Sequence, residues 1–175
     1  MRFRRNQEGA SLVEFALILP VLILLVFGVI EFGTTYNNYL ALRGGVRDGA
    51  RQVTVGNIGS VQSCNNSTYT GANAYTQEII CQTKNRIGSL IGLSQADIRV
   101  DVVGDNFTVG QPIVVCAQAP VKSFTGLFSP FMNGRVLSTK VQMRVENQGS
   151  IPAATSVTGG EAAQSNWNNC TVTSS

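Results

Sequence analysis

Hydrophobic and polar positions divide the chain into a long apolar segment near the N-terminus and a more alternating region behind it. From Phe15 to Ile30 no side chain is strongly polar. As a helix rising ~1.5 Å per residue, this run is roughly 24 Å long, which is short of the ~30 Å hydrocarbon core of a bilayer. Adding residues 10–13 extends it to about 31 Å, provided that Glu14 is tolerated within it. The pattern predicts a membrane-spanning helix over residues 10–33.

Beyond residue 33 the apolar positions keep a helical spacing of three and four residues, which predicts a helical extension over residues 34–55. Gly44, Gly45 and Gly49 each weaken such a helix by roughly 1 kcal/mol relative to alanine, so we expect this part to fray. The apolar stripe of the extension consists of Tyr39, Leu42, Val46, Ala50 and Val53.

A small α+β domain is predicted over residues 56–146. It begins with a Gly-, Asn- and Ser-rich loop up to residue 73. A second helix then fits residues 74–93, because its apolar positions fall within about half of the helical wheel. Cys81 lies off that apolar face. The face consists of Tyr75, Ile79, Ile80, Ile87, Leu90 and Ile91.

Three strands follow the second helix. Residues 97–103 and 135–146 alternate between apolar and polar side chains, while residues 112–121 are apolar on both faces, as expected of a central strand. A roughly three-stranded antiparallel sheet with one face covered by helix would bury these sets. The connection over residues 124–135 contains three phenylalanines, which we expect to pack against the sheet edge or a partner.

Residues 147–175 form a Ser-, Thr- and Asn-rich C-terminal tail with no apolar period. Such a segment is poorly ordered unless it is tethered. Cys170 can supply the tether. Trp167 fits a recognition residue and a packing contact of the tether equally well.

Composition excludes several classes of function. The chain has 13 Lys and Arg against 10 Asp and Glu, and no histidine. A nucleic-acid-binding domain would show a basic face, and none is evident in the folded part. Without histidine, and without a recognisable nucleophile–base pair or metal-ligand cluster, the sequence offers no catalytic site, metal site or cofactor site. We therefore predict a protein that is not an enzyme.

Four cysteines, at positions 64, 81, 116 and 170, are too widely spaced for a zinc or iron–sulfur site. An even number of cysteines in a small exported domain indicates disulfides. The favoured pairing is Cys64–Cys81 with Cys116–Cys170, but four cysteines allow three pairings and their spacing does not choose among them.

Orientation follows from the basic residues. Arg2, Arg4 and Arg5 precede the apolar run, and the next basic residue is Arg43. The positive-inside rule then places the N-terminus in the cytoplasm and the residues after about 32 outside, where disulfides persist. A cleaved signal peptide is the alternative, but no small-x-small cleavage site follows the apolar run.

Glu14 is costly within an apolar span, since insertion scales give about 2.5–3.5 kcal/mol for aspartate at a helix centre. One interpretation is that its side chain merely reaches the interface. The other comes from the junction RRNQEG–ASLVE, in which Glu14 is the fifth residue after Gly9. This junction resembles the processing site of type IV pilin-like precursors. The resemblance implies a basic leader over residues 1–9 that a prepilin peptidase removes between Gly9 and Ala10.

The wider N-terminal segment resembles the TadE-like family, minor pseudopilins of the tight-adherence (Tad, or Flp) pilus. The resemblance rests on the V-E-F-A-L core that contains Glu14 and Phe15, the Glu31-Phe32-Gly33 sequence at the end of the span, and the stretch over residues 46–51. Val46 departs mildly from the alanine typical of that stretch.

The TadE-like resemblance implies a structural subunit with a pilin-like fold, in which Glu14 and Phe15 serve assembly. In type IV pilin-like precursors the glutamate at this spacing neutralises the new N-terminal amine of a neighbouring subunit. Expected partners are other pilins or pseudopilins, the prepilin peptidase, the inner-membrane assembly platform and the lipid bilayer. The expected location is the cytoplasmic membrane, with the domain outside and possible transfer to the pilus. The alternative function is a membrane-anchored binding module that is not incorporated in a pilus.

Overall fold

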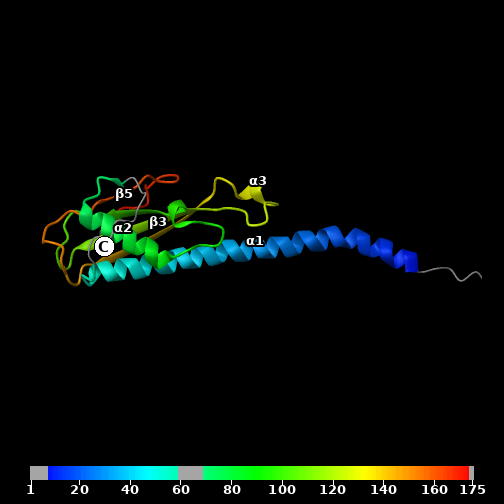
Figure 1. Ribbon diagram of the computed structural model, residues 1–175, viewed down its shortest axis with the longest axis horizontal. Coiled ribbons are helices and arrows are strands. Elements are labelled where there is room, and N and C mark those ends of the chain that lie inside the picture. Colours follow the sequence, from blue (N-terminus) through cyan, green and yellow to red (C-terminus); the bar gives the residue numbers. More distant parts are fainter. Residues whose placement is uncertain (1–7, 59–68, 174–175) are drawn as a thin grey trace, which may run out of the picture.

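The computed structural model describes residues 8–58 and 69–173 as an α+β fold (Figure 1). Helix α1, Glu8–Thr54, runs without interruption from the apolar N-terminal segment into the domain. Its predicted apolar stripe is confirmed, because Leu42, Val46, Ala50 and Val53 are completely buried, while Tyr39 is half-buried. The expected fraying at the glycines is wrong, since the helix continues through Gly49 to Thr54.

The predicted antiparallel sheet is confirmed, with more strands than expected. Within the part of the chain that the structure describes, it has five strands: β1 (Tyr69–Thr70), β2 (Arg99–Val103), β3 (Pro112–Pro120), β4 (Val136–Arg144) and β5 (Gly159–Glu161). They lie in the order β1-β5-β2-β3-β4, and every neighbouring pair is antiparallel. The three predicted strands are β2, β3 and β4. The two short additional strands come from the predicted loop and from the C-terminal tail.

Helix α2, Ala74–Ile87, starts at Asn73, whose side chain accepts a hydrogen bond from the Thr76 backbone N–H. It ends six residues before the predicted end at residue 93, because Gly88 adopts φ 68° and turns the chain out of the helix. Leu90 and Leu93 still reach the core from the turns that follow, whereas Ile91 is exposed. The remaining short helices are a 3-10 turn, η1 (Gln95–Asp97), and α3 (Ser129–Met132).

The predicted position of Cys81 outside the buried face of this helix is wrong, because its side chain is buried. Helix α2 packs against α1 on one side and against β2 and β5 on another. More than one face of α2 is therefore covered. A hydrophobic-wheel argument that assumes a single buried face misses this arrangement.

The main core lies between the sheet and the two long helices, α1 and α2. Val100 and Val102 of β2 face it, together with Ile113 and Val115 of β3. The opposite face of β3 carries a smaller apolar cluster with the C-terminal tail, which includes Trp167. The tail thus covers one face of the sheet and the helices cover the other.

A disulfide between Cys116 of β3 and Cys170 fixes this tail to the sheet. The Trp167 indole N–H also donates a hydrogen bond to the Glu161 carbonyl at 2.9 Å, and the Gln142 side chain pairs with the backbone of Thr173. The sequence predicts that the tail is ordered only if it is tethered, and the structure shows the tether. The predicted partner pair Cys64–Cys81 includes Cys64, which lies outside the described residues.

Candidate assembly helix and its contacts

The N-terminal half of α1 carries the residues that the sequence singles out. This segment is long and apolar enough to cross a membrane, and no part of its most apolar window is buried within the chain. In Figure 1 it extends alone beyond the domain (blue). An apolar surface of this length, left uncovered by its own domain, fits a bilayer or neighbouring helices rather than water. Within residues 8–58 and 69–173 it is the one helix that is long and apolar enough to act as a membrane anchor.

The predicted processing and assembly residues all lie on this uncovered part of α1. Gly9 and Ala10 are in its first turn, and Glu14 and Phe15 follow in the next, all four exposed. No atom lies within 4 Å of the position that a β-carbon at Gly9 would occupy. The fold itself therefore does not require glycine at position 9.

At the other end of the apolar segment, Glu31 is buried and binds the domain. Its carboxylate accepts hydrogen bonds from the backbone N–H groups of Phe124 at 2.8 Å and Thr125 at 3.2 Å. The Thr125 hydroxyl donates a third bond at 3.1 Å. A charged group that is 2% exposed needs such donors, because an unpaired buried charge is very unfavourable. Glu31 therefore attaches the β3–β4 connection to α1.

The phenylalanines of this connection do not pack against the sheet edge, and their packing against a partner stays a prediction. Phe124 and Phe131 are 63% and 78% exposed. Phe128 lies over α1, where its ring would meet a β-carbon at Gly28 at 3.9 Å. The expectation is wrong at the sheet edge because Glu31 draws the connection along α1, toward the membrane segment (Figure 1).

Two glycines at the C-terminal end of α1 let α2 approach closely. A β-carbon at Gly45 would lie 2.4 Å from the Ile87 α-carbon, and one at Gly49 would lie 2.7 Å from the Thr83 hydroxyl oxygen. Distances this short are not compatible with van der Waals packing. The low helix propensity of Gly45 and Gly49 is thus offset by close packing of α1 against α2, which a larger residue would prevent.

A buried ion pair links the tail to α2, and sequence reasoning missed it. The Lys84 ammonium lies 2.6 Å from a Glu161 carboxylate oxygen, and both side chains are buried. The second oxygen accepts from the Val100 backbone N–H at 3.0 Å. No local sequence signal announces this pair, since its members are separated by 77 positions.

Two aspartates of the domain have pKa values moved in opposite directions. The Ser94 backbone N–H, with help from Lys122, lowers the pKa of Asp97 to about 2. Burial raises the pKa of Asp101 to about 6. Asp101 lies in β2, where its register partners are Cys116 and Gly160. These shifts make the stability of the domain depend on pH.

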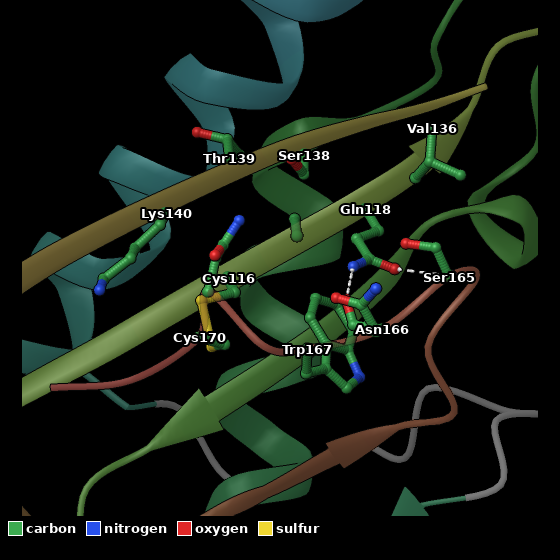
Figure 2. A pocket seen from close by; sticks show the side chains of 12 residues that line it. Cys116, Gln118, Val136, Ser138, Thr139, Lys140, Ser165, Asn166, Trp167 and Cys170 are labelled. Carbon is green, nitrogen blue, oxygen red and sulfur yellow. Dashed lines mark hydrogen bonds between the residues drawn. A yellow bond between two sulfur atoms is a disulfide. The ribbon is translucent and has the colours of Figure 1, made fainter.

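A pocket of about 370 Å³ lies between β3, β4 and the tail, and Figure 2 shows the side chains that line it. The Cys116–Cys170 disulfide and Trp167 lie on its walls, and Gln118 accepts a hydrogen bond from the Ser165 backbone N–H. Lys140 is the one ionisable side chain among the residues lining it. The pocket therefore offers hydrogen-bonding groups but no acid–base pair for catalysis.

Comparison with protein families gives one result. The model of the TadE-like protein family matches residues 9–51. Residues 9–51 are TadE-like. No curated protein and no solved structure matches it. The TadE-like match covers most of α1, including Glu14, Glu31 and both close-packed glycines. It indicates a structural protein associated with the Tad pilus.

Proposed function

We propose that this TadE-like protein is a minor pseudopilin of a Tad pilus, cut by a prepilin peptidase between Gly9 and Ala10. The observation that carries the proposal is the family match over residues 9–51, whose apolar helix leaves Glu14 exposed on a surface that its own domain does not cover. Cleavage creates an ammonium group at Ala10. The mature helix then begins with a positive charge close to the membrane boundary.

Electrostatics give Glu14 its role. A carboxylate within an apolar environment is costly, and so is an ammonium group, but the two attract strongly where the dielectric constant is low. Glu14 of one subunit pairs with the Ala10 ammonium of an adjacent copy or companion, while Phe15 beside it packs against the neighbouring helix. Each charge compensates the other only when subunits are in register, so the pair aligns the helices during assembly.

The size of the exported domain favours a scaffolding or initiating subunit over bulk filament. The domain has a core, a tethered tail and a surface of its own. Its partners are other pilins or pseudopilins, the prepilin peptidase and the inner-membrane assembly platform. The N-terminus faces the cytoplasm and the domain lies outside, as the placement of arginines predicts.

Replacing Glu14 by leucine tests the assembly role. The proposal predicts normal membrane insertion and normal processing of Glu14→Leu, but loss of incorporation into the pilus machinery, measured by co-purification with the other subunits and by pilus assembly. Val13→Leu is the matched control, because Val13 is an exposed apolar neighbour on the same helix. Full assembly by Glu14→Leu would refute the proposal.

The binding-module alternative has one observation in its favour, which is the pocket bounded by the tail (Figure 2). If α1 were only a tether, Glu14→Leu would leave function intact, whereas Lys140→Ala in the pocket would abolish it. The two substitutions therefore separate the two functions.

A further inference from the structure

The β3–β4 connection forms an apolar surface beside the membrane helix. Phe124, Leu127 and Phe131 are 63%, 52% and 78% exposed. From Ser123 to Gly134 the connection has no charged residue. Large apolar side chains gathered in one short exposed loop indicate a surface that is covered in the working protein.

This loop lies at the level where α1 leaves the bilayer. If the span begins at Ala10, ~30 Å of helix ends near Ile30, so that Gly28 lies about 3 Å beneath the outer boundary. The Phe128 ring lies over Gly28, and the Phe124 N–H binds Glu31. In Figure 1 the loop around α3 (yellow) projects from the domain along α1, toward its N-terminal half.

Most backbone N–H groups of the loop are hydrogen-bonded within the protein, as a nonaqueous environment requires. An unpaired N–H group is expensive in a bilayer, and most of the donors here are bonded within the protein. Glu31 accepts from Phe124 and Thr125, and the Ser123 hydroxyl oxygen accepts from Gly126. Further N–H···O=C bonds run from Ser129 to Gly126, from Phe131 and Met132 to Phe128, and from Asn133 to Ser129.

Basic residues flank the apolar loop on both sides. Lys122 precedes it and Arg135 follows it, and both are exposed. The Lys122 ammonium also lies 2.9 Å from an Asp97 carboxylate oxygen, so Arg135 is the basic residue that carries this point. Long basic side chains at the edges of an apolar segment place their charges among lipid headgroups while their stems stay in the interface.

We propose that residues 123–134 form a second membrane contact, in which Phe124, Leu127 and Phe131 insert into the outer leaflet of the bilayer that α1 spans. The inference rests on α1 as a membrane anchor and not on pilus assembly. Continuity favours lipid over a protein partner, because the loop extends the exposed apolar surface of α1 at Val29 and Phe32. With one end of the domain held by α1 and the loop together, the domain has a fixed tilt on the membrane.

Tryptophan quenching by lipid tests this contact in the full chain. All variants carry Trp167→Phe, so that each has a single tryptophan, introduced by Phe131→Trp in the loop, Val29→Trp on α1 or Val109→Trp. Val109 is an exposed apolar residue in the β2–β3 connection, at the opposite end of β3 from the loop. Each variant is reconstituted in phosphatidylcholine vesicles with and without bromine on the acyl chains.

The inference predicts that brominated lipid quenches Phe131→Trp nearly as strongly as Val29→Trp, and leaves Val109→Trp unquenched. Emission of Phe131→Trp that matches Val109→Trp, while Val29→Trp is quenched, would overturn the loop contact and leave the helix anchor intact. A blue shift of Phe131→Trp that grows with protein concentration but not with bromine would show that a second copy covers the loop, and would also overturn it. Absence of quenching at Val29→Trp would remove the anchor on which the inference rests.

Discussion

The Lys84 ammonium and a Glu161 carboxylate oxygen lie 2.6 Å apart, with 4% and 0% of their side chains exposed. Arg99 lies 3.8 Å from the same oxygen, and the Val100 N–H binds the other. This arrangement connects α2, β2 and β5 at one point. It incorporates the C-terminal tail into the domain independently of the Cys116–Cys170 disulfide.

Glu161→Gln should lower the free energy of unfolding by about 3–5 kcal/mol, because it removes one charge of a buried ion pair. Denaturant unfolding of the full chain in detergent micelles measures the change. The matched control is Asp48→Asn, which removes an exposed ion pair with Arg86. That change should cost less than about 1 kcal/mol. Equal effects of the two substitutions would contradict the importance of burial at Glu161.

Gly45→Ala should destabilise the domain even though alanine is the better helix former. The added β-carbon meets the Ile87 backbone at 2.4 Å and forces α2 away from α1. The neighbouring Gly44 provides the control, because it is exposed and nothing lies within 4 Å of its β-carbon position. Gly44→Ala should stabilise the protein by up to about 1 kcal/mol. Thermal unfolding of both variants decides whether packing or propensity governs this helix.

Glu31→Ala should release the β3–β4 loop from α1, because it removes the acceptor of three hydrogen bonds. Hydrogen exchange of the Phe124 and Thr125 amides, followed by mass spectrometry of peptides from residues 121–135, should become faster by at least about tenfold, the equivalent of ~1.4 kcal/mol. Unchanged exchange would mean that other contacts hold the loop. Asp48→Ala, an acidic residue elsewhere on α1, should leave these amides unaffected.

Asp101→Asn should stabilise the domain at pH 7. The folded-state pKa of about 6 lies above the ordinary value of 3.8, so the folded protein holds this proton more tightly than the unfolded chain does. Its contribution to the free energy of unfolding therefore falls as pH rises from about 4 to about 6. The gain should be below about 2 kcal/mol, since the group is partly solvated, and should vanish below about pH 4.

Asp97→Asn provides the comparison of opposite sign. The pKa of Asp97 is lowered to about 2, so this carboxylate contributes stability that is present above about pH 4 and is lost as pH falls toward 2. Its replacement should destabilise the domain at pH 7 and have little effect near pH 2. Unfolding curves of both variants between pH 2 and pH 7 check the two signs together. The same sign for both would contradict the assigned environments.

Regular patterns made the larger elements predictable. The period of two in residues 97–103 and 135–146 gave β2 and β4, and the stripe from Leu42 to Val53 gave the buried face of α1. Strand β5 has no such signal, because Gly159 and Gly160 have no side chains to alternate. Its position depends on contacts with residues far away in the sequence, above all Lys84.

The sequence also could not decide whether the phenylalanines of the β3–β4 connection contact protein or a membrane. The phenylalanines of residues 124–135 are apolar, and apolarity alone does not say what covers them. Glu31 was recognised only as part of a motif, and its attachment to Phe124 required the fold. For Gly9 and Glu14 the sequence is the source and the fold adds little. Their proposed roles rest on spacing along the chain and involve other molecules.

The mass of the mature N-terminus tests the central proposal most directly. The protein is extracted from membranes of a host that contains a prepilin peptidase, and its N-terminal peptide is identified by mass spectrometry. The proposal predicts a chain that starts at Ala10, and Gly9→Ala, which the fold can accommodate, should accumulate unprocessed. A mature protein that retains residues 1–9 and still supports pilus assembly would contradict it.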